Sequence, residues 1–174
     1  NKIISCHLGG GASITAINDG ECIDTSMGFT PLEGLIMATR AGDVDDGAVE
    51  YLQSLTKFDD ADFAHIENHK SGLLGISGYT ADMRTLLEDE ANGNERAHLA
   101  IEMYLYRIQK YIGSYVASLN GLEGVIITAG GGAGADRIRR RIVEPLSYFN
   151  LKVDPKLNDG KINVEEELKI SAFG

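Results

Sequence analysis

The pattern of apolar and polar residues predicts short β-strands over the first part of the chain. Residues 2–6 are a mainly apolar run, residues 13–17 alternate between polar and apolar positions, and residues 21–24 form a third strand-like segment after a short interruption. The interruption, Asn18-Asp19-Gly20, is a hairpin signal that pairs the third segment back onto the second. The pattern predicts a three-stranded antiparallel meander, with a glycine-rich turn over residues 7–13 at its first corner.

A period of three to four residues replaces this alternation further along the chain. The longest predicted helix covers about 94–119 and carries one apolar stripe, formed by Ile101, Tyr104, Leu105, Ile108, Ile112, Tyr115 and Leu119. Asn120-Gly121 is expected to end this helix in the left-handed conformation. The glycine-bearing segment 71–78 is predicted to be a loop. Shorter helices are predicted over 45–55, 59–68 and 80–90.

Residues 30–33, Thr-Pro-Leu-Glu, have the composition of a helix start. Threonine is the N-cap, proline takes the first helical position, and glutamate follows the cap by three residues. We expect this helix to run to about Thr39 or Arg40. A cation at a helix C-terminus is commonly a partner of the helix dipole. The alternative is that the Arg40 guanidinium neutralises charge on a transferring phosphoryl group.

The C-terminal part of the chain predicts a strand, a turn and a helix. An apolar strand over 124–128 leads into a second glycine turn, Gly130–Gly134. A helix is expected from Asp136, and Pro145 must shorten or kink it.

The order of the elements predicts a mixed α/β fold. Residues 151–154 are expected to add one more strand, and the polar tail 156–174 is expected to be an incomplete, loosely structured end. We expect one domain over residues 1–174, in which parallel strands extend the antiparallel meander.

The composition is that of a globular protein with an excess of acidic residues. Hydrophobic residues make up 43% of the 174 residues, and the formal net charge is −10. Such a chain is not expected to bind nucleic acid or an anionic membrane, because basic residues dominate both kinds of binding. No apolar run approaches the ~20 residues that span a bilayer. The first residues also lack the regions of a signal peptide, so we expect a cytoplasmic protein.

The chain has two cysteines, Cys6 and Cys22, and both lie in strand-like segments. We expect reduced core thiols, as is usual in the cytoplasm. Neither cysteine has the short spacing to a second Cys or His that metal sites use, so no metal ligands are predicted. The abrupt ends at Asn1 and Gly174 lead us to expect a piece of a longer protein.

The two glycine turns point to phosphate. The turn His7–Ser13 lies between two strands and lacks the Gly-Lys-Ser/Thr of a P-loop. Its three consecutive glycines are more than a tight corner needs, and successive backbone N–H groups can form an anion site. A second such turn at Gly130–Gly134 suggests a nucleotide held at both ends. His7 could contact phosphate or be a core histidine at a strand end.

A dinucleotide-binding reading remains as an alternative for the second turn. Gly130, Gly132 and Ala135 fit the fingerprint Gly-x-Gly-x-x-Ala, and Asp154 follows about 20 residues later as the ribose-binding acid. That fingerprint should open the first βαβ unit of a sheet, whereas here it lies near the end of the chain. An NAD-binding oxidoreductase domain is therefore the less favoured prediction.

Asp82 and Arg84 fall in the first turn of the predicted helix 80–90. Asp82 at that position favours the helix dipole, and Arg84 is interpreted as a solvated surface residue. Neither position alone indicates a function.

Several segments in a fixed order resemble one family. They are His7–Ile17, Asp24–Leu35, Ala38–Asp43, Ser71–Gly78, Asp82–Arg84 and Gly93–Ala97. Over residues 2–155 the sequence is similar to the acetate kinases of the acetokinase family. The resemblance implies the ribonuclease H-like, actin-like fold of sugar kinases and chaperone ATPases, with helices on both faces of the sheet. This chain would be much of the second, nucleotide-binding lobe.

The resemblance also implies roles for particular residues. The phosphates would be cradled by His7, Leu8, Gly9, Gly10 and Gly11. The adenosine would be contacted by Asp82, Met83 and Arg84, and the second turn would close over it with Gly130, Gly131, Gly132, Ala133 and Gly134. Arg40 would be the catalytic arginine that stabilises the transition state.

The implied reaction is reversible transfer of the ATP γ-phosphoryl group to acetate or a similar short carboxylate, giving ADP and an acyl phosphate. Mg²⁺ would enter with ATP, and the enzyme would be a homodimer. Positioning and charge neutralisation suffice for such a transfer, without a covalent enzyme intermediate.

Two departures from the family weaken this assignment of roles. Gly10 stands where the family commonly has asparagine, and Gly130–Gly134 replaces a Gly-Ile-Gly-Glu-Asn turn. The family's first lobe, which supplies the catalytic aspartate and histidine, has no counterpart in these residues. We therefore expect the 174-residue polypeptide alone to transfer no phosphate. A catalytically silent nucleotide-binding or dimerisation module is the alternative.

Overall fold

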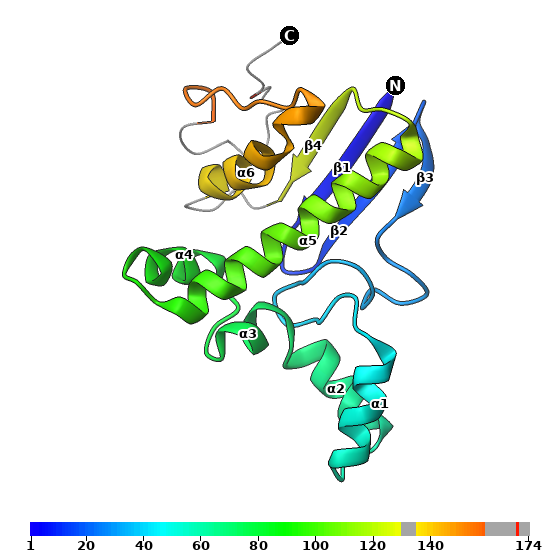
Figure 1. The fold of residues 1–174 in the computed structure, drawn as a ribbon, viewed down its shortest axis with the longest axis vertical. Helices are drawn as coiled ribbons and strands as arrows, with labels where there is room; N and C mark the ends of the chain where they lie inside the picture. Colours follow the sequence, from blue (N-terminus) through cyan, green and yellow to red (C-terminus); the bar gives the residue numbers. More distant parts are fainter. Residues whose placement is uncertain (130–134, 159–169, 171–174) are drawn as a thin grey trace. The chain divides into compact units, whose positions relative to one another are not determined.

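The computed structural model describes residues 1–129, 135–158 and 170, which divide into two compact units (Figure 1). Unit 1 comprises residues 1–9, 14–24 and the described residues from 105 onward. Unit 2 comprises residues 10–13 and 25–104. The second glycine turn, Gly130–Gly134, lies outside the described residues.

Unit 1 is built on a four-stranded mixed sheet in the order β3-β2-β1-β4. Its strands are β1 (Lys2–Leu8), β2 (Ala12–Asn18), β3 (Glu21–Thr25) and β4 (Gly124–Thr128). The connections between the first three strands are too short for a parallel crossover, so these strands form the predicted antiparallel meander. β4 adds to β1 in parallel, with Ile4 opposite Val125 and Cys6 opposite Ile127. Four of the five predicted strands and their mixed arrangement are thus confirmed.

Residues in the left-handed conformation form one turn and end one helix at the positions that the sequence predicts. Asp19 and Gly20 have φ of 50° and 86° and form the hairpin turn between β2 and β3. Asn120 and Gly121 have φ of 51° and 130° and end the longest helix.

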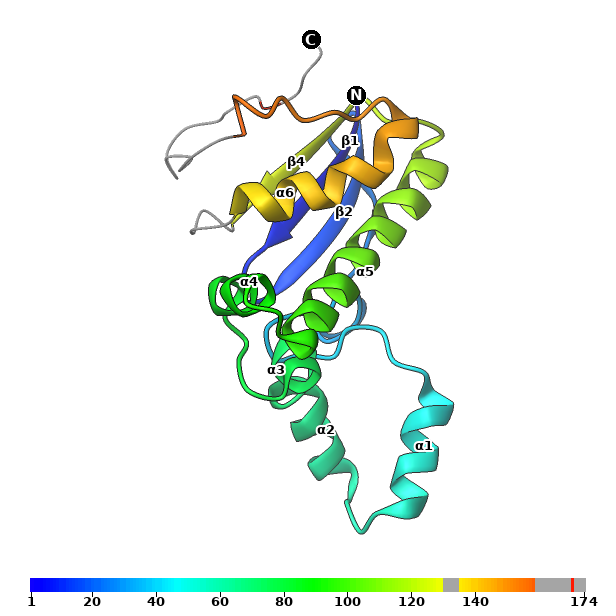
Figure 2. The same ribbon diagram turned by 60° about the vertical axis from the view of Figure 1, so that its left-hand side comes forward.

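One face of the sheet in unit 1 is covered by helices. Figures 1 and 2 both show α6 (Ala135–Val143) and the second half of α5 (Glu95–Leu119) over the same face. The Gln109 side-chain amide of α5 donates to the carbonyl of Arg141 in α6 at 3.0 Å. The other face of β1 carries the half-exposed Ile3 and Ser5. The expectation of helices on both faces is not met by the described residues of this unit.

The buried face explains why α5 forms. All seven residues of its predicted apolar stripe are buried, and Ile108 and Ile112 are completely so. Opposite them the sheet contributes inward residues at every second position, including Ile4, Cys6 and Ile14. Burial of this stripe, rather than helix propensity alone, stabilises the helix.

Two predictions for unit 1 need correction. Residues 151–154 form no strand; Val153 is a single bridge residue, and the Asp154 amide donates to the carbonyl of Ile170. Cys22 is exposed and only Cys6 is a core thiol, because Cys22 lies on β3, all of whose residues are exposed. Pro145 does end α6 as predicted, in a following 3-10 helix, η1 (Glu144–Phe149).

Unit 2 is helical and holds the first turns of α5. Its other helices are α1 (Asp46–Leu55), α2 (Asp60–His69), α3 (Gly72–Ser77) and α4 (Met83–Ala91). Aspartates cap three of them: Asp45 accepts from the amide of Gly47, Asp59 from Asp62, and Asp82 from Arg84. The predicted helices near 45–55, 59–68 and 80–90 are confirmed. Among the described helices, none is long and apolar enough to cross a membrane.

We expect the apolar stripe of α5 to dominate the stability of unit 1. Ile108→Ala should lower the free energy of unfolding by about 2–5 kcal/mol, because it empties a fully buried site. The matched control is Ile126→Ala on β4, which is 50% exposed and should cost about 1 kcal/mol or less. Urea denaturation of the full-length gene product measures both values. Equal losses in the two variants would contradict this packing.

Candidate functional site

The segment between β3 and α1 folds differently from its sequence prediction. No helix forms over residues 31–40, which instead run as turns. Of the local helix-start signals, a contact of 3.4 Å from the Leu32 amide to the Thr30 hydroxyl remains. The amide of Met37 donates to the carbonyl of Arg40 at 3.1 Å, which closes a tight turn that a helix does not allow. The predicted helix is therefore wrong, and Arg40 is not at a helix C-terminus.

Glycines allow the backbone of this segment to form turns in place of the predicted helix. Gly34 and Gly42 have φ of 109° and 76°, in the left-handed region. A Cβ on Gly34 would overlap the carbonyl of Ser26, and one on Gly42 would overlap the carbonyl of Leu35. These two positions hold glycine because the backbone packs against backbone.

The loop also packs against the start of α3. The amides of Ser71, Leu73 and Leu74 donate to the carbonyls of Thr39, Met37 and Ala38, at 2.9–3.0 Å. These donors belong to the first turn of α3, where a helix has no partners of its own. The prediction of a loop over 71–78 is wrong, since α3 occupies most of it. The glycines there serve close packing: a Cβ on Gly72 would overlap the carbonyl of Met37.

Arg40 is brought next to the first glycine turn within unit 2. The amide of Ala38 donates to the carbonyl of Gly10 at 3.1 Å. A Cβ built on Gly11 would lie 3.4 Å from a terminal nitrogen of the Arg40 guanidinium. The guanidinium otherwise contacts the carbonyl of Pro31 at 3.4 Å and the sulfur of Met37 at 3.7 Å. Among the described residues no carboxylate pairs with it, so it is a half-buried cation beside the turn.

The turn itself does not require glycine at position 10. Neither Gly10 nor Gly11 has a left-handed φ, and nothing lies within 4 Å of a Cβ built on Gly10. Both glycines are exposed. A tight corner that depends on glycine geometry therefore does not explain the run. Glycine at position 11 has a separate explanation, because a side chain there would contact the Arg40 guanidinium.

In unit 1 the ends of β1 and β4 are neighbours. His7 is opposite Thr128 in the parallel register, and His7 Nδ1 lies 3.0 Å from the Thr128 hydroxyl. His7 is exposed, so the alternative of a core histidine is excluded. Leu8 is buried, which leaves its backbone as the part that a ligand could contact. The ends of β1 and β4 are thus adjacent, and each strand precedes a glycine-rich segment of the sequence.

Asp82 and Arg84 form a preorganised pair at the start of α4 in unit 2. The Asp82 carboxylate accepts from the Arg84 backbone amide at 2.8 Å and from its guanidinium at 3.1 and 2.6 Å. These hydrogen bonds, first from the side chain and then from the backbone, lower the pKa of Asp82 to about 2. The pair is exposed and stays charged at neutral pH, and Met83 is the first residue of the helix between them.

The described residues bring together one group with the donor types of a metal site. Side-chain ligand atoms of Glu90, His98 and Glu102 lie within 4.8 Å of one another in unit 2. Within this group His98 Nδ1 lies 2.8 Å from a carboxylate oxygen of Glu90, at hydrogen-bonding distance. The cysteines contribute none: burial raises the pKa of the Cys6 thiol to about 12, and Cys22 is a free exposed thiol.

The known proteins to which this chain is similar are carboxylate kinases by name. The acetate kinase of Heliobacterium modesticaldum is 47% identical over 173 residues, which are 99% of this chain and 43% of that protein. The crystal structure of Porphyromonas gingivalis acetate kinase matches with a TM-score of 0.91 at 40% identity, over 98% of this chain and 42% of that one. A Francisella tularensis propionate kinase matches with a TM-score of 0.85 at 39% identity, over 90% and 41%.

A model of the acetokinase family matches residues 1–172, and the chain belongs to that family. The resemblance seen in the ordered motifs is thereby confirmed. The chain spans about 43% of the length of the H. modesticaldum relative.

The packing of α3 on the loop predicts a difference between two left-handed glycines. Gly78 has φ of 85° with open space around a Cβ, so Gly78→Ala should cost about 1–2 kcal/mol for the backbone conformation alone. Gly72→Ala pays the same conformational cost and also forces Met37 away, which should add about 1–3 kcal/mol. Thermal or urea unfolding of the full-length gene product compares the two. A Gly72→Ala variant as stable as Gly78→Ala would show that α3 does not pack on the loop this closely.

Proposed function

We propose that the chain is part of the nucleotide-binding lobe of a carboxylate kinase with the actin-like fold. The whole protein would transfer the γ-phosphoryl group of ATP reversibly to acetate or a similar short carboxylate, giving ADP and an acyl phosphate. Family membership supports the class of reaction, and the similar proteins named above are acetate or propionate kinases.

The observation that carries the proposal is the position of Arg40 in unit 2. Its guanidinium is half-buried beside Gly11, on a loop whose backbone is hydrogen-bonded on both sides. Phosphoryl transfer develops charge on oxygen atoms, and a fixed guanidinium that no carboxylate neutralises stabilises that charge. We assign Arg40 this role.

The remaining site residues are assigned by the family resemblance and by their geometry. The turn from His7 to Gly11 would contact the phosphates, mainly through its backbone. The Asp82–Arg84 pair, with Met83, would contact the adenosine, and its fixed carboxylate can accept hydrogen bonds without first losing a proton. Gly130–Gly134 would close over the nucleotide.

Mg²⁺ would enter as part of the MgATP substrate, and we assign none of these residues to it. The carboxylate pocket and the other catalytic groups would come from the part of the relatives' length that this chain does not span. We therefore expect the 174-residue polypeptide alone to be inactive, and the whole enzyme to be a homodimer.

Replacing Gly10 by the asparagine common in the family should tighten nucleotide binding. A side chain at this position fits without strain, because φ is not left-handed and no atom lies within 4 Å of a Cβ. One added hydrogen bond to a charged phosphate predicts that Gly10→Asn lowers the Kd of MgATP roughly 3- to 20-fold. Gly10→Ala, which adds the Cβ without a donor, is expected to bind within about twofold of the unchanged protein. Calorimetric titration measures all three, and an Asn variant no tighter than the Ala variant would argue against phosphate at this turn.

Removing the guanidinium should affect the chemical step more than nucleotide binding. In the full-length gene product Arg40→Ala is expected to lower kcat about a thousandfold, with the KM for MgATP changed less than about threefold. Arg140→Ala serves as control, since that exposed side chain only pairs with Glu144 on the surface at 3.6 Å. Acyl phosphate formation is assayed with acetate, propionate and butyrate. An unchanged kcat in Arg40→Ala would refute its assigned role, and inactivity of the unchanged protein with every carboxylate would favour a silent nucleotide-binding module.

A further inference from the structure

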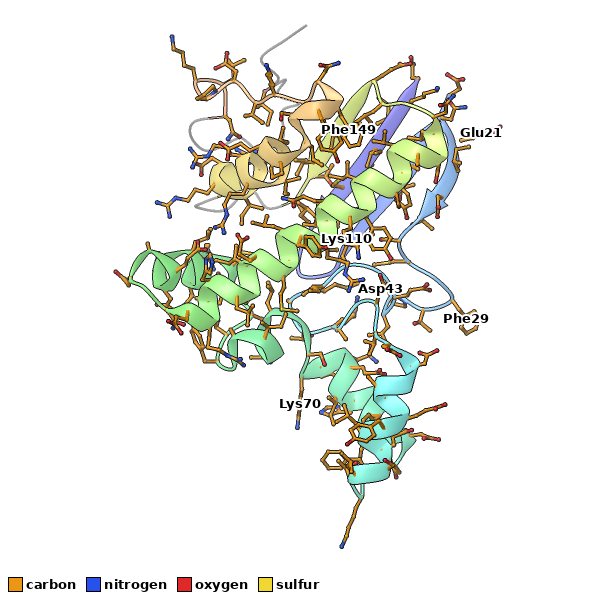
Figure 3. The ribbon with its side chains drawn as sticks, viewed as in Figure 1. Glu21, Phe29, Asp43, Lys70, Lys110 and Phe149 are labelled. Carbon is orange, nitrogen blue, oxygen red and sulfur yellow. The ribbon has the colours of Figure 1, made fainter. Side chains whose placement is uncertain are left out.

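Asp43, labelled in Figure 3, is the last residue of the segment Gly34–Asp43, the loop that carries Arg40. Its side chain accepts a hydrogen bond of 2.9 Å from the amide of Gly34, and its own amide donates to the carbonyl of Gly34 at 3.0 Å. This reciprocal pair joins the two ends of the segment Gly34–Asp43. Asp43 is half-buried and Gly34 is buried, so water competes little for these bonds.

The middle of the same segment is held by neighbouring helices. The amide of Ala41 donates to the carbonyl of Glu67 at 2.9 Å, and the Thr39 hydroxyl donates to the carbonyl of Asn68 at 3.0 Å. Glu67 and Asn68 are in the last turn of α2, where carbonyls lack partners within the helix. The residues on both sides of Arg40 are therefore fixed to α2, while its guanidinium donates weak hydrogen bonds to Pro31 and Met37 in unit 2.

We propose that Asp43 is a positioning residue for Arg40. It acts through the Gly34 amide: the carboxylate closes the loop, and the closed loop holds the Arg40 backbone where its guanidinium reaches the glycine turn. Loss of the acceptor leaves a buried amide unpaired and lets the loop relax. This inference rests on the proposed function. It adds to Arg40, the residue assigned to contact phosphate, a second residue, Asp43, that positions it.

The proposed role depends on the oxygen acceptor at Oδ1, which binds the Gly34 amide. Asp43→Asn keeps that acceptor and should retain kcat within about threefold, whereas Asp43→Ala should lower kcat about 10- to 100-fold, because small displacements of a catalytic group cost this much. The KM for MgATP should change less than about threefold in both. The matched control is Asp45→Ala: this carboxylate also accepts a backbone amide at 2.9 Å, but it caps α1 outside the loop. We expect kcat within about twofold of the unchanged enzyme for that variant.

A double-mutant cycle in the full-length gene product separates positioning from a general loss of structure. In an Arg40→Ala background, Asp43→Ala should lower kcat by no more than about twofold further, because the group that it aims is already gone. If Asp43→Ala folds poorly, Asp43→Glu, which moves the acceptor by one methylene, should show the same dependence on Arg40 with a smaller loss. Equal losses in the presence and absence of Arg40, or an Asn variant as impaired as the Ala variant, would overturn the inference. An Arg40→Ala enzyme with unchanged kcat would overturn the proposed function together with it.

Discussion

The arrangement of unit 2 depends on backbone hydrogen bonds between the segment Gly34–Asp43 and two helix ends, the end of α2 and the start of α3. The last turn of α2 offers carbonyls, and the first turn of α3 offers amides, that neither helix can pair internally. The segment Gly34–Asp43 supplies the partners: Ala41 donates to Glu67, and the carbonyls of residues 37–39 accept from residues 71–74. Capping side chains are absent from the start of α3 because the loop takes their place. In the observed loop the Met37 amide instead closes a tight turn with the carbonyl of Arg40, and the carbonyls of residues 37–39 remain available to the start of α3.

These hydrogen bonds between the loop and the helix ends explain why the sequence predicts some elements of the fold correctly and others incorrectly. The four strands and α5 are correctly predicted because their periodicity reflects burial on one face, which is local in sequence. Thr30, Pro31 and Glu33 also carry a local helix signal, but that signal is worth little against several backbone hydrogen bonds to α2, α3 and Gly10. The glycines at 34, 42 and 72 were the available sign of this packing: each faces a backbone carbonyl at a distance that no side chain allows.

The sequence indicates residues for a candidate site, but it does not give their arrangement. Arg40 and the glycine turn were named as separate features, and their proximity is a consequence of the loop path that the sequence pattern misassigned. The parallel pairing of β1 with β4 follows from the strand order and brings His7 opposite Thr128, so the adjacency of these two strand ends could be anticipated. The position of Asp43 in the loop could not be anticipated, because nothing in its sequence context distinguishes it from Asp45, which caps a helix two residues later.

Holding an arginine by its backbone has a physical advantage over holding it by an ion pair. A carboxylate within hydrogen-bonding distance of the guanidinium would fix its position but would neutralise the charge that a phosphoryl group needs, and separating the pair would cost part of the stabilisation gained. Here the bonds that fix the loop involve main-chain groups, the Thr39 hydroxyl and the Asp43 carboxylate, and the Asp43 carboxylate is bonded to a neutral amide. The hydrogen bonds of the guanidinium within the described part of unit 2 go to a carbonyl at 3.4 Å and a thioether at 3.7 Å, which are weak partners. The loop can thus be rigid while the cation that it carries remains available to an incoming anion, and the glycine at position 11 leaves the space in which the two would meet.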